Sequence, residues 1–221
     1  MMTMMTTITD TLRLLVWLSP AFPTGGFAYS HGLEFAVENG DIKDGPTVQA
    51  WIEDIIRHGA GRTDAILLRH AHRAAADPET LAQLSELARA TAPSRERLAE
   101  TIGQGNAFRR AATPWHPPDQ DGDIPTPIAI GALAGKHGID EDTVCAAALQ
   151  AFAANLISAA VRLVPLGQSA GLAVQAALEH IITKTAAETK TATLDDLGTA
   201  TFRADLAAMH HETQYTRLFR S

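Results

Sequence analysis

The feature that most constrains the fold of this chain is a helical spacing of apolar residues, which recurs along most of its 221 residues. A clear case begins at Cys145, from which apolar side chains follow at steps of three and four as far as Leu163. Such steps place side chains on one face of an α-helix. No segment shows the sustained alternation of apolar and polar residues that is typical of a half-buried strand. The pattern therefore predicts an all-α fold.

Helix boundaries follow from residues that start or stop helices. Asp77-Pro78 and Pro93-Ser94 are typical helix starts, and Gly138 and Gly167 are typical stops. There is no internal repeat and no segment long enough to link two domains. We therefore expect one domain over residues 1–221, a bundle of about ten helices that ends in a tail at about 213–221. The predicted helices span 8–18, 30–38, 46–59, 62–76, 79–91, 94–112, 127–137, 141–163, 168–188 and 201–212.

Two segments interrupt the helical pattern. In residues 19–27, prolines stop a helix and the pair Gly25 and Gly26 permits positive φ angles. Residues 113–127 hold five prolines and three aspartates, which predicts a surface loop. Its aspartates at 119, 121 and 123 resemble the start of an EF-hand, but Ile130 stands where the bidentate glutamate belongs. A solvated acidic loop is the better interpretation.

Charge and cysteine content exclude several classes of protein. A net charge of −7 has the wrong sign for a general nucleic-acid binder. One cysteine, Cys145, rules out an internal disulfide, a cysteine-based zinc site and an iron–sulfur cluster. Only 19% of residues are charged, which fits either partner surfaces or a bland, alanine-rich surface.

Residues 143–161 carry no formal charge and reach the length of a membrane span. They are mostly alanine and include Gln150, Asn155 and Ser158, so a helix in a soluble core is the better interpretation. The first residues lack the basic region and the cleavage site of a signal peptide. We expect a cytoplasmic protein that spans no membrane.

Motifs for chemistry are sparse. Residues 131–137 resemble a phosphate-binding loop but are one residue short of it, and His137 replaces its hydroxyl, so small residues at a helix contact are the simpler interpretation. There is no GxSxG nucleophile motif, and Cys145 lies within an apolar stripe, where a thiol is inert. Glu34 could act as an acid or base, but it has no visible partner. We therefore expect no enzyme activity.

The cluster His210, His211 and Glu212 is the one weak candidate for a metal site, because imidazoles and a carboxylate suit nickel or zinc. Adjacent histidines on a helix point about 100° apart, so one face offers at most one of them. A solvated or partner-facing cluster is the simpler interpretation. A metal-binding protein or a metal-dependent enzyme that uses these three residues remains the alternative function.

The last seven residues place Leu218 and Phe219 between Arg217 and Arg220. Leaving both apolar side chains in water would forgo roughly 1.5–3 kcal/mol each. Docking into a groove, with the arginines at its rim, is the natural outcome. Composition alone leaves open whether this groove belongs to the same chain or to a partner.

Three stretches, taken together and in this order, resemble one family, the urease accessory protein UreF. They are LVWLSPAFPTGGFAYSHGLE at 15–34, AVRLVPLGQ at 160–168 and MHHETQYTRLFRS at 209–221. The resemblance implies an all-α, homodimeric protein that is not an enzyme. It implies a chaperone that bridges UreD (also called UreH) and the GTPase UreG on apo-urease and supports GTP-dependent nickel insertion there.

The resemblance also implies roles for particular residues. Nickel would be the cargo of the complex, with no cofactor bound tightly by this chain. The expected UreD or UreG contact comprises Tyr215, Arg217, Leu218, Phe219, Arg220 and Ser221. A second candidate surface, near the partners or the nickel route, comprises Gly25, Gly26, Phe27, Tyr29, Ser30 and Glu34. A structural turn before a helix is the alternative interpretation of the glycines.

Overall fold

The structure is a computed structural model that describes residues 6–117 and 122–221. The described residues form α-helices and short 3-10 helices without any strand, which confirms the all-α class and the expected number of about ten helices. The α-helices are α1 (Ile8–Trp17), α2 (Leu33–Glu38), α3 (Gly45–His58), α4 (Ala60–Arg73), α5 (Pro78–Ala90), α6 (Arg95–Ala111), α7 (Thr126–Lys136), α8 (Glu141–Leu163), α9 (Gln168–Glu188) and α10 (Phe202–His211). The 3-10 helices, which the apolar spacing does not predict, are η1 (Gly26–Ala28), η2 (Thr189–Thr191) and η3 (Leu194–Asp196).

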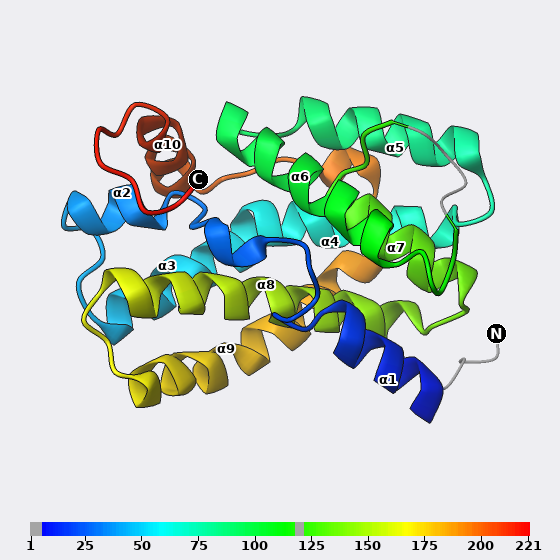
Figure 1. The fold of residues 1–221 in the computed structure, drawn as a ribbon, viewed down its shortest axis with the longest axis horizontal. Coiled ribbons are helices and arrows are strands. Elements are labelled where there is room, and N and C mark those ends of the chain that lie inside the picture. Colours follow the sequence, from blue (N-terminus) through cyan, green and yellow to red (C-terminus); the bar gives the residue numbers. More distant parts are fainter. Residues whose placement is uncertain (1–5, 118–121) are drawn as a thin grey trace.

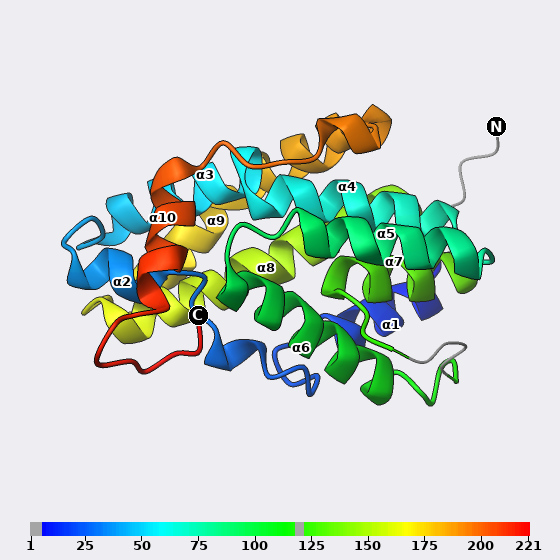
Figure 2. The ribbon, with the colours of Figure 1, turned by 90° about the horizontal axis from the view of Figure 1, so that it is seen from above.

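The helices form an elongated bundle (Figure 1). The main pairings are α4 with α7, α8 with α9, α3 with α9, and α6 with α7. The short helix α2 packs against α10 at the end of the molecule where the chain terminates, while α1 lies near the other end (Figures 1 and 2). The chain therefore brings residues near both of its ends into contact at one end of the bundle.

Polar side chains cap the helices where the sequence predicts a start. Asp77 accepts hydrogen bonds from the amides of Glu79 and Thr80 at the start of α5. The Ser94 hydroxyl accepts one from the amide of Arg97 in α6. These bonds satisfy amides that have no partner inside the helix.

Helix α2 is the element for which the predicted start is wrong. It begins at Leu33 instead of residue 30, because His31 and Gly32 have φ angles of 57° and 75°. Left-handed residues cannot continue a right-handed helix, so the chain makes a turn there. The paired glycines also differ from expectation: Gly25 has a φ of 75°, whereas Gly26 has no positive φ.

Glycines in α7 allow that helix to approach α4 closely. A Cβ on Gly131 would lie 2.2 Å from the carbonyl oxygen of Leu68, and one on Gly135 would lie 2.3 Å from that of His72. The segment that resembles a phosphate-binding loop is therefore a helix contact, as the simpler interpretation predicted. Cys145 is fully buried, and burial raises the pKa of its thiol, which keeps it in the unreactive protonated form.

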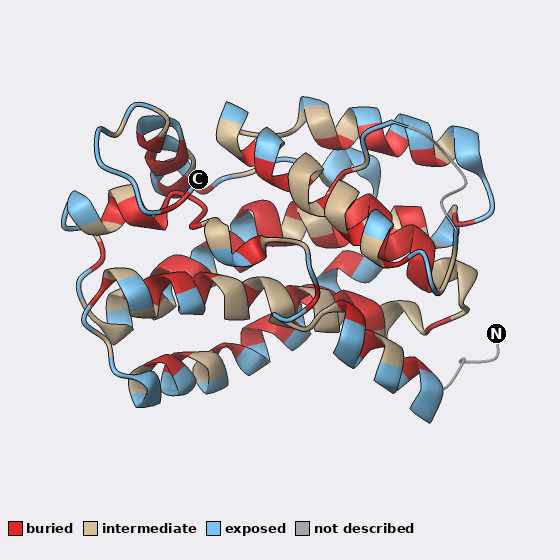
Figure 3. Cartoon of the chain, viewed as in Figure 1, coloured by how far each residue is buried: buried red, intermediate tan, exposed pale blue. Residues whose placement is uncertain are grey.

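Helix α8 is the one helix among the described residues that is long and apolar enough to cross a membrane by length and composition. In this structure it packs against α9, α4, α3 and α2. Less than half of its most apolar stretch is fully buried (Figure 3).

The predicted surface loop at 113–127 is described only in part, because residues 118–121, with Asp119 and Asp121, lie outside the described residues. Asp123 accepts a hydrogen bond of 2.7 Å from the Asn106 side chain. Asn106 in turn accepts one from the amide of Ile124, and this pair of bonds ties the end of the loop to α6.

Candidate functional site

The end of the chain lies against the turn that precedes α2. The amide of Arg220 donates to the carbonyl oxygen of Ala28, and the amide of Ser30 donates to that of Ser221, both at 2.8 Å. We call this contact the C-terminal seam; it comprises residues 28–34, 211–221 and the first turns of α6. The seam brings together two groups of candidate residues, one within 25–34 and one within 215–221, which the sequence indicates separately. Figure 1 shows the chain end beside α2.

Glu34 is the central acceptor of the seam. Its buried carboxylate accepts hydrogen bonds from the amides of Leu218 at 2.7 Å and Phe219 at 2.9 Å. The Nε2 atom of His211 lies 3.2 Å from the same carboxylate. The partner that the sequence does not reveal for Glu34 is therefore the tail itself, together with the last residue of α10.

His211 is fully buried between two carboxylates. Its Nδ1 atom lies 2.7 Å from Glu96, opposite the Nε2 contact with Glu34. An imidazolium would donate to both carboxylates, and a neutral ring to only one. Glu96 also accepts a hydrogen bond of 2.7 Å from the guanidinium of Arg217. A chain of close polar contacts, from Glu34 through His211 and Glu96 to Arg217, thus connects α2, α10, α6 and the tail.

A second buried ion pair holds the last residue. Arg97 and Glu100, one turn apart on α6, form a close ion pair that is shielded from solvent. Glu100 also accepts a hydrogen bond of 2.8 Å from the hydroxyl of Ser221. The Ser30 hydroxyl donates to the carbonyl oxygen of Ser221, so that residue is held from both sides.

Phe219 and Leu218 face opposite ways. The Phe219 side chain is 6% exposed, and the guanidinium of Arg162 lies 4.4 Å from the centre of its ring. Leu218 is 78% exposed, and Tyr215 is fully exposed. The groove that receives Phe219 therefore belongs to this chain, while Leu218, Tyr215 and the exposed Arg220 remain accessible on the outer side.

The candidate residues within 25–34 also divide into a buried group and an exposed group. Ser30 and Glu34 are buried in the seam, whereas Phe27 is 69% exposed. The Tyr29 hydroxyl lies close to Gly103 of α6. Gly25 has open space around it, and Gly26 faces the side chains of Gln104 and Asn155.

The side chains of the three candidate metal ligands point toward different partners. His210 is exposed and stacks on Phe35 at 5.1 Å, whereas His211 points into the seam. Glu212 accepts a hydrogen bond from the amide of Arg95 at the start of α6. Within residues 6–117 and 122–221, no group of three or more histidine, cysteine, aspartate or glutamate side chains is placed to hold a metal ion.

Sequence reasoning missed the part of α6 that belongs to the seam and the contact that α8 makes with Phe219. Glu96 and Glu100 are four residues apart and share a helix face, a spacing that usually indicates a solvated surface. Their role depends on partners more than 100 residues away in the chain. Arg162 lies within one of the three stretches that resemble a family, but only the fold places it over Phe219.

All carboxylates of the seam are engaged in hydrogen bonds or ion pairs. Charge-assisted bonds of this kind are stronger than neutral ones, and in a buried setting they define one arrangement of the chain. The bonds of the seam therefore hold the tail in one position and leave its outer side chains exposed.

Comparison with known proteins gives a consistent result. The profile of the UreF family matches residues 42–179. The urease accessory protein UreF of Cereibacter sphaeroides is 54% identical over 95% of this chain and 98% of its own length. That of a Bradyrhizobium species is 49% identical over 95% and 91%, and that of Brucella ovis is 47% identical over the full length of both. The match with the Brucella ovis protein covers the whole chain, seam included. From the family profile and these relatives, this chain belongs to the UreF family.

Proposed function

We propose that this protein is a non-catalytic accessory factor in urease maturation, which bridges UreD (UreH) and the GTPase UreG on apo-urease. In that role it would support GTP-dependent insertion of nickel, the cargo of the complex, without holding a cofactor of its own. Its place of action would be the cytoplasm. The relatives named urease accessory proteins support the general role.

The observation that carries the partner contact is the split between Phe219 and Leu218. Phe219 anchors the tail in this chain, so Leu218 and Tyr215 stand exposed at fixed positions beside Arg217 and Arg220. Tyrosine and arginine, the types of Tyr215, Arg217 and Arg220, are enriched among the residues that dominate binding energy. A tail that is already ordered also loses less conformational entropy on binding than a free one. The proposed contact with UreD therefore consists of these outer side chains.

Point substitutions test this contact better than removal of the tail, because deletion also removes Phe219 and Ser221 from the seam. Leu218→Asp changes only an exposed side chain. We expect this variant to lose co-purification with tagged UreD while its circular dichroism spectrum stays that of the parent protein. The same variant should fail to support activation of apo-urease in cells that carry the other accessory proteins.

Ile8→Asp is the matched control, since Ile8 is 83% exposed near the other end of the bundle. It should bind UreD as the parent protein does. Retention of UreD by Leu218→Asp would contradict the proposed contact. Loss of UreD by both variants would mean that apolar exposure in general, and not the tail, governs binding.

A homodimer is also proposed, and α8 supplies the support for it. Ala147, Ala151 and Ala154 follow one another at helical spacing and are only partly buried within this chain. Small side chains on an incompletely covered helix permit close approach of a second copy. Light scattering coupled to size exclusion should give twice the chain mass, and Ala147→Glu should reduce it to that of a monomer.

The alternative function, a metal-dependent protein that uses His210, His211 and Glu212, receives no support from the geometry, because the three side chains have separate partners.

A further inference from the structure

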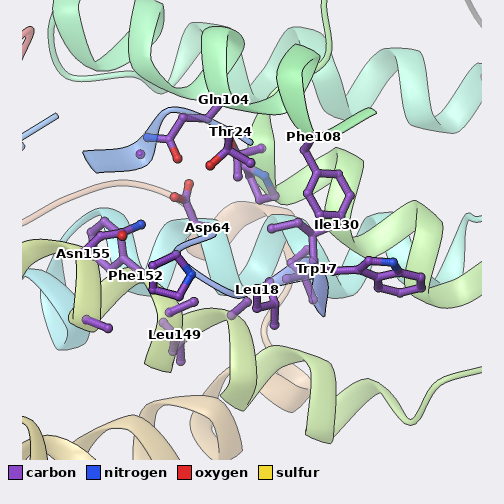
Figure 4. A pocket seen from close by; sticks show the side chains of 18 of the residues that line it. Trp17, Leu18, Thr24, Asp64, Gln104, Phe108, Ile130, Leu149, Phe152 and Asn155 are labelled. Atoms are coloured by element: carbon purple, nitrogen blue, oxygen red, sulfur yellow. The ribbon is translucent and has the colours of Figure 1, made fainter. Parts of the chain in front are cut away.

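A cavity of about 190 Å³ lies between the end of α1, the segment 18–27, α4, α6, α7 and α8. It is separate from the C-terminal seam, and none of the charged residues of the seam lines it. Figure 4 shows its side chains, which divide into an apolar part and a polar part. An apolar cavity of about 150 Å³ is large enough to bind benzene. This cavity therefore has room for one aromatic ring and a small substituent.

The apolar part is formed by large side chains from four helices, α1, α6, α7 and α8, and from the segment that follows α1. These side chains are Trp17, Leu18, Phe108, Ile130, Leu149 and Phe152. Burial of an apolar body against such walls is favourable at roughly 25 cal/mol per Å². The part also contains aromatic rings, whose faces attract cations.

The polar part is formed by Asp64, Gln104, Asn155 and Thr24, whose side chains gather at one end of the cavity (Figure 4). Among the described residues, no cation lies within ion-pair distance of Asp64 and no donor is hydrogen-bonded to its carboxylate. The positive charge of Arg97 lowers the pKa of Asp64, but the Arg97 guanidinium is paired with Glu100. Burial raises the pKa of Asp64 to about 6, so at neutral pH the carboxyl is mostly ionised.

Gly26 keeps the polar part open. A Cβ at this position would lie 3.0 Å from the Asn155 side-chain nitrogen and 3.4 Å from the Gln104 side-chain oxygen. Since Gly26 has no positive φ, its backbone does not require glycine. Glycine suits this position because a side chain would fill space beside the cavity. Gly25 has a different reason, the positive φ angle of a turn.

An ionised carboxylate without a partner at the end of an apolar cavity calls for a ligand with the opposite charge. A bare metal ion would find only one charged ligand there, and the apolar walls would leave it unsolvated. We infer that this cavity binds a small organic cation, a primary amine or an amidine with an apolar body about the size of one ring. Its cationic group would donate a hydrogen bond to Asp64, and the side-chain oxygens of Gln104 and Asn155 would accept hydrogen bonds from its remaining N–H groups. This inference does not depend on the proposed role in urease maturation.

Benzylamine and benzyl alcohol form a suitable pair of probes, because they have the same ring and differ in charge. Calorimetry on the full chain at neutral pH should show benzylamine bound at least about tenfold more tightly than benzyl alcohol, as expected for a charge-assisted hydrogen bond. Asp64→Asn should remove this difference and leave the affinity for benzyl alcohol unchanged. Gly26→Ala should weaken both probes, since it narrows the cavity.

Asp54→Asn is the matched control, because Asp54 is an exposed carboxylate on α3. It should leave both affinities unchanged. Thermal unfolding of each variant verifies that it is folded, and if Asp64→Asn is not, Asn155→Leu tests the same end of the cavity. Failure of benzylamine to bind in the low-millimolar range would overturn the inference. Equal binding of benzylamine to the parent protein and to the folded Asp64 or Asn155 variant would overturn it as well.

Discussion

The carboxylate of Glu34 accepts a hydrogen bond of 2.9 Å from the amide of Phe219, which follows it by 185 residues. The same carboxylate accepts one from Leu218, so two consecutive amides of the tail share one buried acceptor. This arrangement explains how a short segment without regular structure is held in place. It also makes this side chain at the start of α2 the acceptor for two consecutive amides in the middle of the tail.

Glu34→Gln should loosen the tail. A carboxylate offers two acceptor oxygens, whereas an amide offers one and turns an N–H group toward one of the existing donors. We expect a loss of about 1.5–3 kcal/mol, the usual contribution of charged hydrogen bonds. Hydrogen exchange at the amides of Leu218 and Phe219 and tryptic cleavage after Arg217 should both become faster. Glu188→Gln, at an exposed site, should change neither, and unchanged exchange in Glu34→Gln would refute the anchoring role.

Phe219→Ala and Leu218→Ala should differ strongly, although the residues are neighbours. Removal of a buried phenylalanine side chain costs about 3–5 kcal/mol, whereas an exposed leucine contributes little. Urea unfolding monitored by circular dichroism measures both. Similar stabilities of the two variants would show that Phe219 is not packed in the body of the protein.

Gly32→Ala and Gly25→Ala form a pair in which both glycines have a φ of 75°. The backbone strain should be about 1–2 kcal/mol in each. At Gly32 the new Cβ would also lie 2.7 Å from the amide nitrogen of Ala208, whereas at Gly25 it meets open space. We therefore expect Gly32→Ala to be the less stable variant in thermal unfolding and to displace α10 from α2. Equal melting temperatures would contradict this packing.

Asp64→Asn should stabilise the protein at neutral pH. The pKa of Asp64 is raised from 3.8 to about 6, mainly by burial, with Arg97 lowering it and Glu100 raising it. The folded state thus holds a proton that the unfolded state releases, and the stability from this group is lost as pH rises from about 4 to about 6. Above pH 6 the variant should be more stable by up to about 3 kcal/mol, and near pH 4 the difference should vanish. A difference that does not depend on pH would contradict the raised pKa.

The effect of His31 on the pH dependence of stability should be opposite to that of Asp64. Burial, together with the positive charge of Arg97, holds the pKa of His31 well below its ordinary value of 6.5. The unfolded chain therefore takes up a proton below about pH 6.5 that the folded protein does not, so stability falls as the solution is acidified. His31→Asn keeps a residue type that tolerates the left-handed backbone. Below pH 6.5 the variant should lose less stability on acidification than the parent, by up to about 1.4 kcal/mol per pH unit.

Helix positions were largely predictable because they depend on neighbouring residues. The apolar spacing from Cys145 to Leu163 and the capping residue Asp140 lie within one segment, and α8 has its predicted bounds, Glu141–Leu163. The start of α2 was not predictable in this way. His31 adopts a left-handed conformation although it is not glycine, and its surroundings come from α8 and the tail.

The sequence by itself determined the all-α class, most helix boundaries, the exclusion of cysteine-based sites and, through three stretches, the resemblance to one family. Only the tertiary structure decided that the turn before α2, the end of α10 and the tail form one seam, with Phe219 inside it and Leu218 outside. It also separated the two glycines, since Gly25 serves a turn and Gly26 leaves space beside a cavity. The physical reason is that helix propensity and capping act over a few residues, whereas burial and ion pairing depend on groups far apart in the chain.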